Sequence, residues 1–172
     1  RPSDIPPAHD RLILTFTDGD SLAFNDPRKF GRVWLIKDSS TVFGNLGPEP
    51  LDEAFTSQSF YTRLQKHHRQ LKPLLLDQAF LVGVGNIYAD ESLHLAKLHP
   101  LTLSHSLSPA QAETLWRSLR AVLAEGILRH GASIDWVYRG GDFQNYFRVY
   151  RRAGEACPEC GAPIERIERR MY

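Results

Sequence analysis

A short glycine-rich turn is the part of the sequence best suited to hold an anion. The run Gly83-Val84-Gly85-Asn86 stands directly before a stretch with helical spacing, Asn86 to Leu98. Glycines let a backbone turn tightly and approach a ligand, and the free N–H groups at a helix N-terminus attract phosphate. Asn86 suits the N-cap position, and Lys72 upstream could add a positive charge. The same turn could also serve only to join two packed helices.

The triplet Arg28-Lys29-Phe30 is a second candidate, since it places two cations and one aromatic ring in a predicted loop. An exposed Phe can wedge between base steps, and Arg can occupy the space of an extruded base. Alternatively, the Phe ring packs back under the sheet and the charges are only solvated. The triplet suits a disrupted nucleic-acid duplex, but by itself it does not establish one.

The two cysteines, Cys157 and Cys160, have a spacing typical of one half of a zinc site. This spacing is poor for a structural disulfide and indicates a reducing compartment. A structural zinc ion takes four ligands, so two thiolates form an incomplete site in this chain.

β structure is predicted for the N-terminal part that carries the Arg28 loop. Apolar and polar residues alternate over Leu12 to Phe16, and after an Asp18-Gly19 turn we expect Ser21 to Asn25 to complete a hairpin. Gly31 to Ile36 provides a third expected strand. The proline-rich stretch Gly47 to Pro50 then marks the change from strands to helices.

Helices are predicted after Pro50 over Ser57 to about His67 and over Asn86 to Leu98. The clearest begins with the capping box Ser108-Pro109-Ala110-Gln111, which has proline at the first helical position, and continues as an apolar stripe until Gly131. The two segments after it, Ile134 to Tyr138 and Phe147 to Tyr150, are expected to be short strands or connecting loop.

Composition disfavours a membrane-spanning or secreted protein. No apolar run approaches the roughly 20 residues needed to cross a bilayer, and no leader precedes a cleavage site, so we expect a cytoplasmic location. The net charge is +1, but residues 1–60 carry six basic and nine acidic side chains, whereas residues 61–172 carry fifteen basic and eleven acidic ones. The excess of positive charge in the part with the glycine turn modestly favours a nucleic-acid partner.

Several of these motifs occur together in a recognisable order. Asn25-Asp26-Pro27-Arg28-Lys29-Phe30-Gly31-Arg32 and Leu46-Gly47-Pro48-Glu49-Pro50-Leu51 precede the glycine turn, and Gly141-Asp142-Phe143-Gln144-Asn145 and Cys157-Pro158-Glu159-Cys160-Gly161 follow it. In this order they resemble the formamidopyrimidine-DNA glycosylase and endonuclease VIII family of helix-two-turn-helix repair enzymes. The resemblance spans about His9 to Ile164.

The resemblance implies an α+β fold in three parts. Residues 1–50 would form part of an N-terminal β-sandwich lobe with a DNA-wedge loop, residues 51–150 a helix-two-turn-helix DNA-binding domain, and residues 151–172 the first half of a zinc-finger hairpin. The implied activity is that of a bifunctional DNA glycosylase and AP lyase in base excision repair, which removes oxidised bases, with oxidised purines favoured. The implied partner is double-stranded damaged DNA, and we expect a monomer.

The resemblance also implies roles for individual residues. Arg28 would face the orphaned base and Phe30 would intercalate, while His9 would contact the DNA backbone. The phosphates flanking the lesion would be bound by Lys72 and Asn86, with Gly83 and Gly85 allowing close backbone approach. Structural zinc is implied at Cys157 and Cys160, although the second cysteine pair of the family is not in this chain.

No catalytic residue is assigned. Enzymes of the family attack C1′ of the damaged nucleotide with the secondary amine of an N-terminal proline, form a Schiff base and cut the strand. Here Pro2 is amide-linked to Arg1 and no glutamate follows it. We therefore expect the sequence to be an internal piece of a longer protein, and it is left open whether the chain alone is active.

Two other functions are left open. A catalytically silent relative would keep the DNA-binding motif and the wedge loop without the amine, and the absence of a Met-Pro-Glu start upstream would favour it. An RNA- or ribosome-associated protein could use the same helical motif for phosphate contact, but the wedge loop argues against it.

Overall fold

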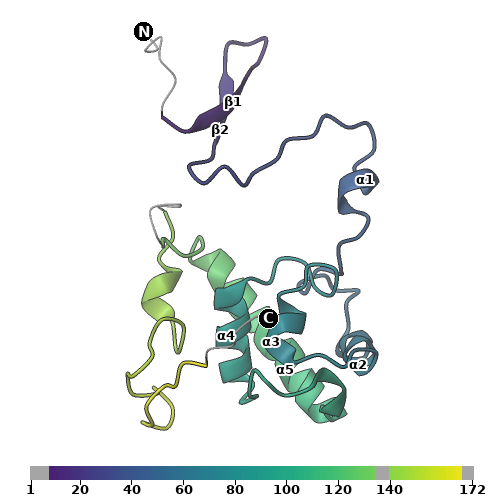
Figure 1. The fold of residues 1–172 in the computed structure, drawn as a ribbon, viewed down its shortest axis with the longest axis vertical. Helices are drawn as coiled ribbons and strands as arrows, with labels where there is room; N and C mark the ends of the chain where they lie inside the picture. The colour runs from purple at the N-terminus through teal and green to yellow at the C-terminus, as the bar shows by residue number, and fades with distance from the viewer. Residues whose placement is uncertain (1–7, 135–139, 168–172) are drawn as a thin grey trace. The chain divides into compact units, whose positions relative to one another are not determined.

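Two compact units, residues 1–41 and 42–172, make up the computed structural model, which describes residues 8–134 and 140–167 (Figure 1). A two-stranded sheet and several helices confirm the predicted α+β class. None of the helices in the described part is both long and apolar enough to cross a membrane. The elements, in chain order, are β1 (Asp10–Thr15), β2 (Ser21–Asn25), α1 (Ser40–Phe43), α2 (Ser57–Gln65), α3 (Leu71–Leu75), α4 (Asn86–Leu95), the 3₁₀ helix η1 (Ser104–Ser106), α5 (Pro109–Leu128) and the 3₁₀ helix η2 (Phe143–Tyr146).

The first unit contains the predicted hairpin. Strand β1 pairs antiparallel with β2, with Leu12 opposite Phe24 and Leu14 opposite Leu22. Gly19 takes the positive φ of 94° that the tight turn between the strands requires. The alternating pattern and the Asp18-Gly19 signal were therefore sufficient to predict the hairpin, while its register is given by the structure.

The third predicted strand, Gly31 to Ile36, is wrong, because no strand is assigned to this stretch. A strand requires a neighbour for its N–H and C=O groups, and no described strand of the first unit pairs with these residues. Val33, Trp34 and Leu35 are exposed accordingly. β-propensity reports side chains that suit a sheet surface, but it does not report whether a partner strand is present.

Helix α5 is the centre of the second unit, and α2 and α4 pack against it (Figure 1). Its predicted capping box is confirmed: the Ser108 side chain accepts the N–H of Gln111, and the Gln111 side chain accepts the N–H of Ser108. The helices predicted from Ser57 and Asn86 are confirmed as α2 and α4. Phe147 to Tyr150 forms connecting loop after η2, and most of the stretch from Ile134 to Tyr138 lies outside the described residues.

A continuous apolar core joins these helices. It contains fully buried leucines of the short helix α3, which the sequence did not predict, together with Phe60 of α2 and Leu115 and Leu119 of α5. Burying one such side chain contributes roughly 1.5–3 kcal/mol, so α3 is held mainly by tertiary packing rather than by helix propensity.

The segment entering the second unit lies directly against the loop before the glycine turn. The Gly47 N–H donates to the Gln78 carbonyl at 2.8 Å, and the Val82 N–H donates to the Pro48 carbonyl at 3.3 Å. A Cβ on Gly47 would lie 2.6 Å from the Phe80 backbone, so only glycine fits this contact.

Candidate nucleic-acid interface

Helix α4 begins one residue earlier than the sequence suggested. Gly85 is the N-cap, in extended conformation and without a side-chain cap, and Asn86 is the first helical residue. The prediction that Asn86 caps the helix is therefore wrong: Gly85 already supplies the extended backbone, and the Asn86 side chain is exposed. Gly83 has a φ of 83°, and nothing lies within 4 Å of a Cβ placed on either glycine. The turn is thus open to an incoming group.

The Gln78 side chain holds the glycine turn in shape. Its Oε1 accepts the Gly83 N–H at 2.9 Å, and its Nε2 donates to the Val84 carbonyl at 3.0 Å. Because one amide bonds both a donor and an acceptor of the turn, the turn is preorganised and does not depend on a ligand for its conformation.

Lys72 and Asp90 form an ion pair beside this turn. The Lys72 Nζ lies 2.8 Å from Asp90 Oδ1 and 2.9 Å from Oδ2, and the two side chains are 32% and 25% exposed. Asp90 lies one helical turn after Asn86, on the same face of α4. The ion pair therefore holds the lysine ammonium next to the exposed asparagine.

A cleft of about 870 Å³ opens at this place. Lys72, Asn86 and Asp90 line one side, and the segment after η2 lines the other, contributing Tyr150, Arg151 and Arg166 among others. Three cations and two carboxylates, Asp90 and Glu165, face the cleft, so its formal charge is positive. A cleft with exposed amide, ammonium and guanidinium groups suits a phosphate backbone.

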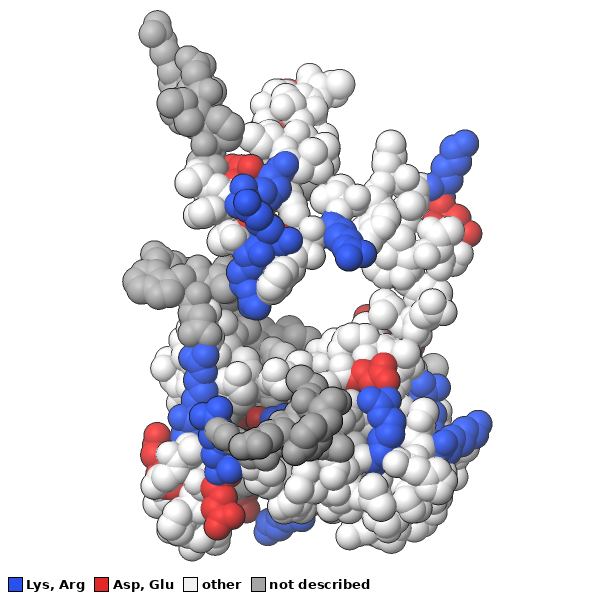
Figure 2. All heavy atoms as spheres, in the orientation of Figure 1, with Lys and Arg blue, Asp and Glu red and all other residues white. Residues whose placement is uncertain are grey.

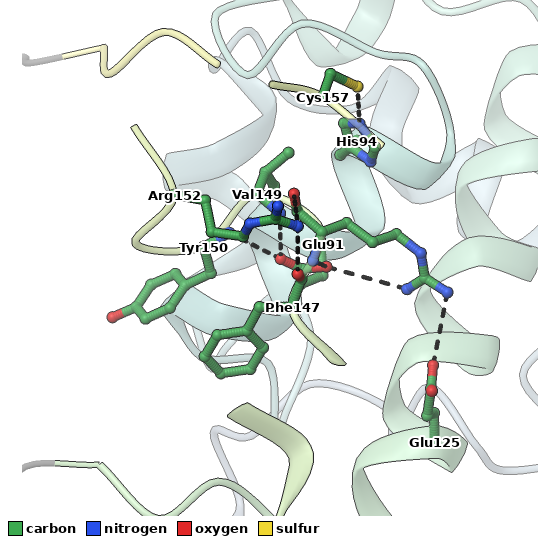
Figure 3. A network of polar contacts seen from close by, with 9 residues as sticks. Glu91, His94, Glu125, Phe147, Val149, Tyr150, Arg152 and Cys157 are labelled. Atoms are coloured by element: carbon green, nitrogen blue, oxygen red, sulfur yellow. Dashed lines mark hydrogen bonds and ion pairs between the residues drawn. The ribbon is translucent and has the colours of Figure 1, made fainter. Parts of the chain in front are cut away.

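A buried glutamate fixes the second wall of the cleft (Figure 3). Glu91 of α4 is fully buried, and its carboxylate accepts the backbone N–H groups of Arg148, Val149 and Tyr150 at 2.8, 2.9 and 2.8 Å. The Arg148 guanidinium lies 4.0 Å from Glu91 and 3.7 Å from Glu125 of α5. A buried carboxylate is tolerated when it is hydrogen-bonded in this way, so Glu91 ties the C-terminal segment to α4.

The first unit carries the predicted wedge loop around Arg28, Lys29 and Phe30. The Asp26 carboxylate accepts the N–H groups of Arg28, Lys29 and Gly31 at 3.1, 2.9 and 2.6 Å, and these hydrogen bonds, the one from Gly31 first, lower the pKa of Asp26 from its ordinary value. The Phe30 ring is 74% exposed, and the Arg28 guanidinium carbon lies 4.8 Å from its centre. The ring therefore does not pack back under the sheet, which was the alternative left open.

His9 lies at the base of the same loop. Its carbonyl accepts the Asp26 N–H at 3.0 Å, and its ring nitrogen Nδ1 lies 3.4 Å from the Arg11 guanidinium. The structure thus groups His9, Arg28 and Phe30 within the first unit, whereas it groups Lys72, Gly83, Gly85 and Asn86 within the second.

The two cysteines form a knuckle that fits half of a zinc site. Hydrogen bonds from His94, first, and from the backbone N–H groups of Cys160 and Glu159 lower the pKa of the Cys157 thiol to about 6. Such a sulfur is ready to act as a thiolate ligand. Within residues 8–134 and 140–167, however, no group of three or more His, Cys, Asp or Glu side chains is arranged to hold a metal ion.

Charge is distributed unevenly but is not segregated. On the face shown in Figure 2, basic side chains of the second unit are interspersed with acidic ones. This face therefore does not present one large positive field.

Sequence reasoning missed several groups that shape the cleft. Asp90 and Glu91 lie in the early turns of α4, where carboxylates suit the helix dipole, but the structure uses them to hold Lys72 and the C-terminal segment. Gln78, which supports the turn, also went unnoticed. The basic run from Arg148 to Arg152 was the available sign that this segment is charged: Arg151 lines the cleft, whereas Arg148 faces Glu91 and Glu125 and Arg152 pairs with Glu155.

Comparisons with known proteins agree with this geometry. Residues 46–137 match the profile of the Formamidopyrimidine-DNA glycosylase H2TH domain. The chain is 41% identical over 169 residues to the formamidopyrimidine-DNA glycosylase of Pelotomaculum thermopropionicum, a match that covers 94% of this chain and 61% of that protein.

Solved structures give the same result. The MutM (Fpg) protein of Thermus thermophilus is similar with a TM-score of 0.85 and 42% identity, over 95% of this chain and 65% of that one. The Lactococcus lactis Fpg, in complex with DNA containing an abasic site, is similar with a TM-score of 0.84 and 37% identity, over 96% of this chain and 64% of that one. The chain therefore spans somewhat less than two thirds of the length of these relatives.

Proposed function

Because the chain belongs to the formamidopyrimidine-DNA glycosylase family, we propose that it acts in base excision repair, as the DNA-binding portion of a DNA glycosylase and AP lyase that removes oxidised purines from duplex DNA. The observation that carries this proposal is the cleft in which Lys72 and Asn86 meet beside an open glycine turn. The Lactococcus lactis relative bound to abasic-site DNA supports the choice of partner.

In this proposal the second unit binds the phosphates on either side of the lesion. Lys72 supplies an ammonium group, Asn86 supplies an amide, and the backbone at Gly83 and Gly85 approaches the strand without a side chain in between. These contacts carry no sequence information, which suits an enzyme that must act wherever damage occurs.

The wedge loop of the first unit would fill the duplex where the damaged nucleotide has left it. Phe30 is exposed and can insert between base steps, and Arg28 can donate to the orphaned base. His9 at the base of the loop would contact the DNA backbone. The loop is preorganised by Asp26, so little ordering is needed on binding.

Zinc belongs to this proposal as a structural group. Cys157 and Cys160 would hold two of its four positions, and the bound ion would contribute folding free energy to the C-terminal hairpin. We also retain the division into parts at residues 1–50, 51–150 and 151–172, action as a monomer, and a cytoplasmic location.

Binding is tested by fluorescence anisotropy of the chain with a duplex carrying a tetrahydrofuran abasic analogue and with the matched intact duplex. We expect tighter binding to the damaged duplex, and we expect Phe30→Ala to remove that preference while Asn86→Ala weakens binding to both duplexes. Equal binding of the two duplexes by the unmodified chain would contradict the proposal.

Chemistry is tested separately by borohydride reduction of the product of the complete gene incubated with an 8-oxoguanine duplex. A covalent adduct identifies an amine nucleophile and supports a lyase. Binding without an adduct would instead identify the catalytically silent relative.

A further inference from the structure

Arg151 has a backbone conformation that is unusual for an arginine. Its φ is 61°, in the left-handed region that residues with a Cβ rarely adopt. The Arg152 N–H donates to the Val149 carbonyl at 3.1 Å and closes a four-residue turn in which Arg151 is the third residue. A positive φ at this position is typical of a type II turn, where glycine or asparagine is usual. The turn therefore carries a cation where its backbone favours a small residue.

Two other residues with a positive φ have a local reason for it. Lys97 and His130, with φ of 55° and 56°, each directly follow the C-cap residue of a helix. A left-handed residue is a common way to end a helix. Arg151 follows a loop, since the preceding helix η2 ends five residues earlier, so helix termination does not account for its conformation.

The structure on both sides of Arg151 holds the turn in place (Figure 3). The buried Glu91 carboxylate accepts the N–H groups of Val149 and Tyr150 at 2.9 and 2.8 Å, which ties the first two turn residues to α4. The Arg152 guanidinium donates to two carbonyl groups of the segment just before the turn, at 3.0 and 3.2 Å. Strained residues persist where their surroundings overdetermine the backbone in this way, and they cluster at ligand-binding and other functional sites.

The Arg151 side chain is exposed and lines the second wall of the cleft beside the glycine turn. On the first wall, the Lys72 ammonium is offset by Asp90 at 2.8 Å. Apart from this pair, the described residues that line the cleft carry two cations, Arg151 and Arg166, and one carboxylate, Glu165. The net positive charge that the cleft offers to an anion therefore comes from its second wall. A guanidinium suits a phosphate there, because its planar fork of N–H donors matches two phosphate oxygens.

We propose that Arg151 binds a backbone phosphate of the DNA from the second wall of the cleft, as a contact additional to those of Lys72 and Asn86. This inference rests on the proposed function, which makes duplex DNA the occupant of the cleft. A phosphate contact carries no sequence information, so Arg151 adds affinity for damaged and intact duplexes alike. A glycine in its place would relax the turn but leave this wall without the contact.

The test combines fluorescence anisotropy of Arg151→Gly, with the tetrahydrofuran and intact duplexes at several salt concentrations, and urea unfolding of the same variant. Binding of both duplexes should weaken about eightfold at 0.1 M salt, and the slope of log K against log salt should fall by about 0.9. The urea midpoint should stay the same or rise, because glycine adopts a positive φ without a Cβ contact. Arg151→Lys keeps the charge and should retain the salt slope of the unmodified chain.

Lys97→Gly is the matched control. It removes an exposed cation that has nearly the same φ as Arg151 but does not line this cleft. Affinity and salt slope should therefore match those of the unmodified chain. A fall in slope as large as that of Arg151→Gly would show a general loss of charge and would overturn the proposal.

Two further results would overturn the proposal and leave the proposed function standing. One is unchanged affinity and slope in Arg151→Gly while Asn86→Ala still weakens binding. The other is weaker binding with an unchanged slope and a lower urea midpoint, because Arg151 would then only support the turn. If the unmodified chain binds neither duplex, the proposed function fails and this inference fails with it.

Discussion

Replacing Lys72 with Gln should weaken duplex binding and at the same time flatten its dependence on salt. The ammonium lies at the cleft wall with Asn86, so it can neutralise one phosphate. Loss of one phosphate contact lowers the slope of log K against log salt by about 0.9, which corresponds to roughly eightfold weaker binding at 0.1 M salt and roughly fourfold at 0.2 M.

Replacing Asp90, the ion-pair partner of Lys72, should have the opposite effect on duplex binding. Asp90 offsets the ammonium at 2.8 Å, and its carboxylate would also repel a phosphate at the cleft. A unit charge about 4 Å away contributes about 1 kcal/mol in water, or about a fivefold change in affinity. We therefore expect Asp90→Asn to tighten binding by up to about fivefold and to steepen the salt slope.

Anisotropy titrations at several salt concentrations measure both effects. The matched controls are Arg117→Gln and Glu113→Gln, which break an exposed ion pair on α5 outside the cleft and should leave affinity and slope unchanged. If Lys72→Gln and Asp90→Asn weaken binding alike, the ion pair is only a structural support and the reasoning about phosphate contact is refuted.

Three further predictions concern stability and pH. Glu91→Gln should lower the free energy of unfolding by about 2–3 kcal/mol, because a charged acceptor of three amides is lost. Glu125→Gln breaks only a 3.7 Å ion pair with Arg148 and should cost less than about 1 kcal/mol. Equal losses in denaturant melts would contradict the conclusion that Glu91 ties the C-terminal segment to α4. Gly83→Ala should lower the free energy of unfolding by about 1 kcal/mol more than Gly85→Ala. Both sites have open space around a Cβ, but of the two only Gly83 has a positive φ. The same denaturant melts check this ordering. Because the folded loop favours the Asp26 carboxylate, this group stabilises the fold above its ordinary pKa of 3.8, and the stabilisation is lost as the pH falls below that value. The amide NMR signals of Lys29 and Gly31 should shift in that pH range. They should not shift there in Asp26→Asn.

Features that depend on neighbouring residues were predictable from the sequence. The capping box of α5 and the hairpin turn each need only a few adjacent residues, and both are present. The start of α4 was misplaced by one residue because Asn is a good cap in general, while here the extended Gly85 takes that position. Such an error is small in the fold, but it changes what the Asn86 side chain is available to do.

Features that depend on distant residues were not predictable. Glu91 bonds amides more than fifty positions away, and no local pattern marks a carboxylate for that use. The stretch from Gly31 to Ile36 has the composition of a strand, yet strand formation depends on a partner. The resemblance to a known family named the residues of the proposed interface, whereas the supporting contacts of Gln78, Asp90 and Glu91 became visible only in the structure.

The contact at Gly47 implies that the glycine turn is sensitive to changes at a remote position. Any larger residue there would push on the backbone at Phe80, two residues beyond Gln78, whose amide shapes the turn. A substitution at Gly47, near the start of the helical unit, would thereby affect the glycine turn, although the two are far apart along the chain. A screen for altered affinity that sampled only cleft-lining positions would overlook this route.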